Sequence, residues 1–296
     1  MPSIKAIKQR RNVVINMKQA MKAMNLVATA KLRKSRERWG NTLPFLEGTD
    51  KIMMGAAKSP ATAGNIYVKE RDARHKNTGY VVFTSDKGKC GSYNINICKA
   101  VLAHANAHGK NAVLLPVGNR GVDFFLSQSQ DIHRQLGAMP VNPEFEDAEK
   151  LGLAVLADFC GDPEADKPGA IDELYMAYTR YHTVLNLEPT IKPVLPISLR
   201  LKDEPDDDTE PSEMEYDPDV DSFLGYMAPM YFNTQIYGAM LEAALCEQAA
   251  RMVATDTATN NAQELIEDLT LQYNRRRQGI ITQEITEIVS GASALR

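Results

Sequence analysis

The chain has 296 residues, of which 44% are apolar and 24% charged, so its composition is that of a folded protein with one or two domains. No run approaches the roughly 20 consecutive apolar residues of a membrane-spanning helix, and the first residues lack the apolar run of a secretory signal. The net charge of −4 conceals eleven basic and one acidic side chain in residues 1–38, and eleven acidic residues between Asp203 and Asp221, so the basic end predicts an acidic partner.

The N-terminal segment predicts a long helix. Residues 3–43 contain no proline and a single glycine, Gly40. Apolar residues recur with steps of seven, three and four, at Ile7, Val14, Met17, Met21, Met24 and Ala28. This spacing is typical of the narrow apolar seam of a coiled coil rather than of a broad globular face. A second helix must therefore cover the seam.

The central part of the chain has a different periodicity, which predicts an α/β domain with a mostly parallel sheet. Short apolar runs predict buried strands at 79–84, 112–117, 174–178 and 191–201, and helices are expected at 92–108 and 144–160. The acidic segment 203–221 contains three prolines and is expected to be a mobile loop.

The last predicted element is a helix that begins after Pro229, beyond which the chain has no proline. Its apolar residues recur at steps of three and four, at Ala258, Ala262, Leu265, Leu269 and Tyr273, and then at Ile281, Ile285 and Ile288. The two terminal helices together predict a long antiparallel two-helix coiled coil. The expected divisions are an N-terminal coiled-coil helix at 1–60, the α/β domain at 77–202, the acidic loop at 203–221 and the C-terminal coiled-coil helix at 222–296.

The loop 85–94 is the main candidate for chemistry, because it joins a predicted strand to a predicted helix, where α/β proteins place phosphate-binding loops. Its two glycines match neither the GxxxxGK[ST] nor the GxGxxG pattern, which favours a tight turn with Ser92 near the helix cap over a nucleotide site. Cys90 lies beside two lysines, but the five histidines show no spacing typical of a triad or a metal site. We therefore expect no catalytic residue, cofactor or metal. The four cysteines lie far apart without CxxC spacing, which favours reduced thiols in a cytosolic protein.

Two basic segments, 22–33 and 274–278, lie on the terminal helices. A solvated coiled-coil face would explain their charge. The apolar residues beyond the second segment form a wider surface than one seam, which includes Ile280, Ile281, Ile285, Ile288 and Val289. One partner helix would leave part of this surface in water, so the pattern predicts that a surrounding partner covers it.

Three segments resemble the gamma subunit of F-type ATP synthases, the central rotor stalk. They are 22–33 (KAMNLVATAKLR), 84–94 (TSDKGKCGSYN) and 249–295, which contains NRRRQ at 274–278 and ITQEITEIVSGA at 281–292. They occur in the expected order and cover both ends of the chain and the domain between them.

The resemblance implies that the chain is not an enzyme. It would rotate inside the alpha/beta hexamer and couple transmembrane proton or sodium flow to ATP synthesis or hydrolysis on the beta subunits. The α/β domain would form a foot that contacts an epsilon-type subunit and the membrane c-subunit rotor ring. No nucleic acid and no direct membrane insertion are implied. The absence of a presequence adds the expectation of a peripheral protein on the cytoplasmic side of a bacterial plasma membrane.

The resemblance also assigns roles to single residues. Contacts with the alpha and beta subunits are implied for Arg277, Gln278, Thr282, Glu284 and Glu287. Lys22 and Met24 match a region that faces an acidic segment of beta. A low-friction apolar bearing is implied for Ile281, Ile285, Ile288 and Val289.

Two other functions stay open on the residues alone. A basic coiled-coil protein could bind nucleic acid, although a basic zipper separates its basic region from its heptads, whereas both occupy residues 5–34 here. An enzyme could be built on residues 77–200.

Overall fold

The computed structural model describes residues 3–71, 76–107, 111–161, 170–203, 216–217 and 219–294. The chain divides into two compact units, which are described separately. Unit 1 combines residues 1–29 with residues 251–296, and unit 2 comprises residues 30–250. Two helices contribute to both units: α1 (Ile4–Ala57) and α6 (Val220–Ala294).

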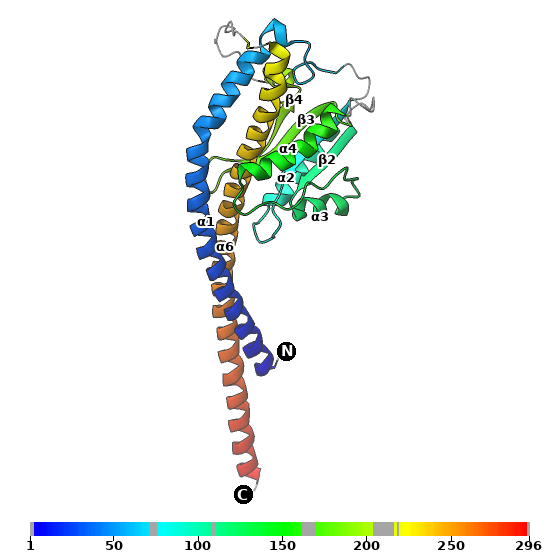
Figure 1. Cartoon of the computed structure of the whole chain (residues 1–296). Helices are drawn as coiled ribbons and strands as arrows, with labels where there is room; N and C mark the ends of the chain where they lie inside the picture. Colours follow the sequence, from blue (N-terminus) through cyan, green and yellow to red (C-terminus); the bar gives the residue numbers. More distant parts are fainter. Residues whose placement is uncertain are drawn as a thin grey trace. The chain divides into compact units, whose positions relative to one another are not determined.

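Unit 1 is an antiparallel pair of helical segments, one from the start of α1 and one from the end of α6 (Figure 1). The direction follows from the contacts, because Arg11 lies over Tyr273 whereas Asn25 bonds to Thr255. The predicted antiparallel coiled coil of the two ends is therefore confirmed.

Both long helices contain a proline. Helix α1 has 54 residues with Pro44 inside it, and α6 has 75 residues with Pro229 inside it. A proline removes one backbone hydrogen bond and normally interrupts a helix. Here apolar side chains on both sides of each proline are buried in unit 2, for example Leu224 and Tyr231 around Pro229, so packing holds each helix together.

The sheet of unit 2 has four strands in the order β2-β1-β3-β4 (Figure 1). They are β1 (Asn77–Phe83), β2 (Asn111–Val117), β3 (Glu173–Tyr181) and β4 (Leu187–Leu195). Strand β1 is parallel to both β2 and β3, and β4 is antiparallel to β3. The predicted mostly parallel sheet is confirmed.

Helices cover both faces of the sheet. The remaining elements are η1 (Pro60–Thr62), α2 (Tyr93–Ala107), α3 (Asn119–Ser127), α4 (Phe145–Cys160) and α5 (Ile197–Asp203). Alternate residues of a strand point to opposite faces. Tyr80 and Val82 of β1 therefore pack with α2 and α3, whereas Val81 and Phe83 pack with α4 and with parts of α1 and α6.

The strand predicted at 191–201 is wrong in its second half. Strand β4 ends at Leu195, and α5 follows from Ile197. Pro196 stands between the two elements. A proline alone does not end this edge strand, because β4 itself contains Pro189 and Pro193. The apolar run alone did not distinguish a strand from a short helix.

Helix α6 begins with a side-chain cap. Asp219 accepts hydrogen bonds from the backbone N–H of Ser222 at 2.9 Å and from the Ser222 hydroxyl at 2.9 Å. These bonds lower the pKa of Asp219. The cap lies at the end of the acidic segment 203–221, most of which, 204–215 and 218, lies outside the described residues.

Candidate partner-binding surface

The helical pair of unit 1 is held together by apolar layers. Ile7 and Val14 of α1 are buried against Ala262 and Leu269 of α6. Half-buried residues, Leu265 among them, pack against this cluster. The apolar positions predicted on the C-terminal helix between 258 and 273 therefore do face α1.

Polar layers alternate with these apolar ones on α1. Arg11, Lys18 and Asn25 stand seven residues apart, and each reaches α6. The guanidinium carbon of Arg11 lies 5.6 Å from the ring centre of Tyr273, a cation–π contact. Lys18 Nζ donates to Gln263 Oε1 at 2.6 Å, and Asn25 Nδ2 donates to a backbone carbonyl of α6 at 2.9 Å. The observed seam of α1 is therefore half polar.

The prediction that Met17 belongs to the seam is wrong. Its side chain is 45% exposed, because Lys18 occupies the seam position beside it. Met24 is half-buried beside Asn25, which fills the next polar layer. Apolar spacing alone favours Met17 and Met24 as core residues, although their polar neighbours Lys18 and Asn25 occupy the seam.

Met17 and Met24 belong instead to a second stripe. Together with the exposed Val13 and Val27 they follow steps of four, seven and three along α1. Residues with this spacing lie on one side of a helix. Lys22, predicted to contact a partner, is also exposed on this segment. The stripe was not found from the sequence, although its spacing was readable there.

The end of α6 is open to solvent. Every side chain from Asn274 to Ala292 except Ile280 is exposed. The residues assigned to the apolar bearing are 45% to 71% exposed: Ile281, Ile285, Ile288 and Val289. At about 100° per residue, these four lie within an arc of about 100° around the helix. Exposed apolar area of this kind indicates a binding surface.

The polar residues predicted to contact partners are all exposed: Arg277, Gln278, Thr282, Glu284 and Glu287. By the same helical geometry, Gln278 falls inside the apolar arc, and Arg277 and Thr282 lie at its edges. Glu287 lies well outside the arc and accepts a hydrogen bond from Gln283 Nε2 at 2.9 Å. The structure therefore groups most, but not all, of the predicted contact residues around one apolar surface.

The loop 85–94 binds its own polar groups. The Ser85 backbone N–H donates to Asn94 Oδ1 at 2.9 Å, and Asn94 Nδ2 donates to the Ser85 hydroxyl at 2.8 Å. Cys90 is buried beside them, with its Sγ 3.2 Å from Asn94 Nδ2. These hydrogen bonds join the two ends of the loop to each other. This agrees with the tight turn that the glycine spacing favoured.

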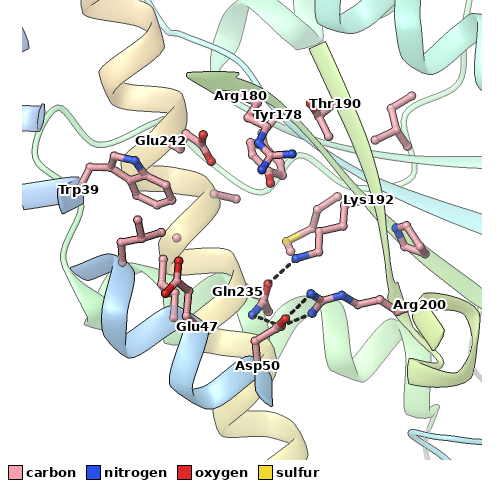
Figure 2. Close-up of a pocket in the computed structure, with 17 residues that line it drawn as sticks. Trp39, Glu47, Asp50, Tyr178, Arg180, Thr190, Lys192, Arg200, Gln235 and Glu242 are labelled. Atoms are coloured by element: carbon pink, nitrogen blue, oxygen red, sulfur yellow. Dashed lines mark hydrogen bonds and ion pairs between the residues drawn. The ribbon is translucent and has the colours of Figure 1, made fainter. Parts of the chain in front are cut away.

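Unit 2 contains a buried polar cluster that the sequence analysis missed (Figure 2). The guanidinium of Arg200 on α5 forms a bidentate ion pair with Asp50 of α1. Tyr231 Oη and Gln235 Nε2 of α6 each donate to Asp50 Oδ1 at 3.1 Å. The cluster ties three helices together. Asp50 and Arg200 are 150 residues apart, so no local pattern could reveal the pair.

Side chains of α6 also extend the hydrogen bonding of β3. Strand β1 pairs with β3 only as far as Ala177. Farther along β3, the Cys246 thiol donates to the carbonyl oxygen of Thr179 at 3.1 Å, and the backbone N–H of Tyr181 donates to Glu242 Oε1 at 2.9 Å. Side chains of α6 therefore bond to backbone groups of β3 in the region where β1 no longer pairs with it.

Among the described residues, no three His, Cys, Asp or Glu side chains are grouped so that they could hold a metal ion. In the same parts of the chain, no helix combines the length and apolar character that crossing a bilayer requires.

Comparison with known proteins identifies the family. The family model described as ATP synthase matches residues 3–295. An ATP synthase gamma chain of Staphylococcus epidermidis is 37% identical over 298 residues, covering 100% of both chains. A gamma chain of Acetobacterium woodii described as sodium ion specific is 36% identical, covering 99% of both chains.

Solved structures share the fold. A chain of a Euglena gracilis mitochondrial ATP synthase structure aligns with a TM-score of 0.69 at 19% identity, covering 99% of this chain and 94% of that one. A chain from the central stalk and c-ring of the Tetrahymena thermophila mitochondrial ATP synthase aligns with a TM-score of 0.62 at 23% identity, covering 81% and 99%. With the full-length matches above, the chain belongs to the ATP synthase gamma-chain family.

Proposed function

We propose that this chain is the central rotor shaft of an F-type ATP synthase. It turns inside a hexamer of alpha and beta subunits and couples transmembrane proton or sodium flow to ATP synthesis or hydrolysis. The observation that carries the proposal is family membership along the whole chain, from residue 3 to residue 295. The chain itself performs no chemistry in this proposal, and the catalytic sites lie on the beta subunits.

The exposed end of α6 is the proposed bearing. Its apolar arc, centred on Ile285, would be covered by a sheath of alpha and beta subunits, and burial gives about 25 cal/mol for each Å² removed from water. Dispersion and apolar burial lack the directionality of hydrogen bonds, so they hold the arc with little preference for one angle of rotation. The exposed polar residues of this segment are proposed to contact alpha and beta, Glu287 from outside the arc: Arg277, Gln278, Thr282, Glu284 and Glu287.

The stripe of α1 is proposed to meet a different part of the partners. Lys22 lies on the same segment of α1 but on nearly the opposite side from Met17 and Met24, at about 100° per residue. It supplies a cation that suits an acidic segment of beta. Rotation would bring the stripe and the arc past each beta subunit in turn. Because each orientation has its own contact free energy, rotation would shift the conformational populations of the catalytic sites.

The α/β part of unit 2, residues 77–202, is proposed as the foot that contacts an epsilon-type subunit and the c-subunit ring. The protein would then be peripheral, on the cytoplasmic side of a bacterial plasma membrane. Nucleic acid is not a partner in this proposal. A purified chain that binds DNA on filters, with an affinity that falls steeply with salt, would contradict it.

Reconstitution tests the rotor proposal and the bearing together. The chain is assembled with alpha, beta and the remaining subunits, and ATP-driven ion pumping is measured in vesicles. The double variant Ile281→Asp with Ile285→Asp places two charges in the apolar arc, and we expect at least a tenfold loss of pumping. The matched control Tyr226→Asp changes an exposed side chain of α6 outside both the arc and the proposed foot, and should pump normally.

The outcomes separate the two claims. Normal pumping by the double variant would contradict the bearing. Failure of the parent chain to assemble with alpha and beta would contradict the rotor. ATP turnover by the purified chain alone would contradict its non-catalytic role.

A further inference from the structure

A cavity of about 480 Å³ lies entirely within unit 2, between the β3–β4 hairpin and the two long helices (Figure 2). One wall comes from β3 and β4, and the other from residues 39–50 of α1 and 235–242 of α6. It contains the only tryptophan of the chain, Trp39. The rotor proposal makes no use of this cavity.

The hairpin wall is basic and rich in hydrogen-bond donors. Tyr178 and Arg180 are two residues apart on β3 and so point to the same face, and Thr190 is the cross-strand partner of Tyr178. Lys192 of β4 lines the same wall. Burial raises the pKa of Tyr178 to about 12, so its hydroxyl remains a donor at neutral pH. This wall suits an anionic group.

The helix wall is acidic and aromatic. Glu242 of α6 is only 5% exposed, and its Oε1 accepts the bond from the Tyr181 backbone. Glu47 of α1 adds a second carboxylate, and the indole ring of Trp39 lies on the Glu242 side of the cavity (Figure 2). A carboxylate with an aromatic ring beside it suits a cationic group, through charge pairing and a cation–π contact.

The two walls are joined by one hydrogen bond, from Lys192 Nζ of β4 to Gln235 Oε1 of α6 at 3.3 Å (Figure 2). Burial raises the pKa of Glu242. The hydrogen bond from the Tyr181 backbone counteracts that rise, as do the nearby charges of Arg180, His182 and Lys192. In the described part of the chain, no ion pair joins Arg180 to Glu242 or Glu47. Asp50 and Arg200, at the other end, neutralise each other. The cavity therefore carries separated charges of opposite sign, with space between them.

We propose that this cavity binds a small zwitterionic molecule. Its anionic group would lie against Arg180 and the Tyr178 hydroxyl, and its cationic group against Glu242 and the ring of Trp39. A molecule with both charges satisfies both walls, whereas a simple anion or cation leaves one wall uncompensated in a partly buried site. The site is independent of the rotor function.

Trp39 allows the proposal to be tested on the full chain, because its fluorescence reports on the cavity alone. The probes share one carbon skeleton: 6-aminohexanoate carries both charges, hexanoate only the negative one and hexylammonium only the positive one. We expect a saturable fluorescence change with 6-aminohexanoate and none with the other two. Isothermal titration calorimetry with the same three probes gives a readout that does not depend on Trp39.

Two variants test the assigned walls. Glu242→Gln keeps an acceptor for the Tyr181 backbone but removes the charge, and Arg180→Gln changes an exposed side chain. Each should weaken 6-aminohexanoate binding at least tenfold. The matched controls Glu264→Gln and Arg10→Gln change exposed charges of unit 1 and should bind as the parent does. Thermal unfolding of each variant verifies that it is folded.

Three results would overturn the proposal. They are the absence of saturable binding in both measurements, equal binding of hexanoate or hexylammonium, and unchanged binding of 6-aminohexanoate in both wall variants.

Discussion

The two units bury side chains in different ways. Unit 1 consists of one helix pair whose seam alternates apolar and polar layers, and its end, from Asn274 onward, is exposed. Unit 2 surrounds a sheet with helices, and its large side chains, such as Phe159 and Phe232, are completely buried. A unit that satisfies its own apolar surface needs no partner for stability. The apolar arc of unit 1 is left open, which is why we propose the binding surface there.

The largest contrast should appear on removing a large apolar side chain from each unit. Phe232→Ala in α6 opens a cavity in the core of unit 2 and should lower the free energy of unfolding by about 3–5 kcal/mol. Ile288→Ala, on the same helix in unit 1, should change it by less than about 0.5 kcal/mol. Urea unfolding followed by Trp39 fluorescence measures the first change, and circular dichroism the second. Equal losses of unfolding free energy in the two variants would contradict the difference in burial between the two units.

The buried ion pair of unit 2 comes next. Asp50→Ala leaves the guanidinium of Arg200 without its carboxylate and should cost about 2–3 kcal/mol in the same urea experiment. The double variant Asp50→Leu with Arg200→Met replaces both charges by apolar groups and should recover most of the loss. If the double variant is as unstable as the single one, the loss of unfolding free energy comes from altered packing and not from the unpaired charge.

Two glycines of α6 should respond in opposite directions to alanine. At Gly238, in unit 2, an added Cβ would lie 2.8 Å from Leu46 Cδ1, so overpacking should cost about 1–2 kcal/mol. At Gly279, in unit 1, nothing lies within 4 Å, and alanine should stabilise the helix by about 0.5–1 kcal/mol. Urea unfolding tests the first, and hydrogen exchange of the backbone around residue 279 the second. Stabilisation at both positions would contradict the close packing of Gly238.

The smallest expected effect is on pH dependence in unit 2. Burial raises the pKa of Glu242 above its unfolded value, about 4.3, so the folded state holds its proton more tightly than the unfolded state does. The favourable contribution is therefore complete below the unfolded pKa and is lost as pH rises through the folded one. Glu242→Gln should gain stability relative to the parent at pH 7, and the gain should shrink near pH 4. If the stability gain of Glu242→Gln instead grew as the pH fell, the pKa of Glu242 would be lowered by folding and not raised.

Features that depend on a pattern within one stretch of sequence could be predicted, and features that depend on contacts between distant residues could not. The terminal helices repeat one pattern over many turns, so their pairing followed from residues such as Val14 and Leu269. The exact seam did not, because Lys18 and Asn25 occupy core positions that an apolar pattern cannot assign. Helix α3 has only nine residues, too few to stand out beside the neighbouring strand.

The candidate sites divide along the same line. The exposed arc around Ile285 was predicted because its apolar residues exceed what one seam can cover. The Asp50–Arg200 cluster depends on residues from three helices, and the two-walled cavity on residues from five elements. Only the folded chain brings these together, so no spacing in the sequence indicates them.

The polar layers at Arg11, Lys18 and Asn25 have a consequence for the newly made chain. A seam of uninterrupted leucine and isoleucine would adhere to almost any amphipathic helix, including that of another copy of the same polypeptide. Each of these half-buried side chains has its contact on α6: Tyr273 for Arg11, Gln263 for Lys18 and a backbone carbonyl for Asn25. A helix without matching partners would leave these contacts unmade. Discrimination of this kind would disfavour pairing of the seam with another copy of the chain.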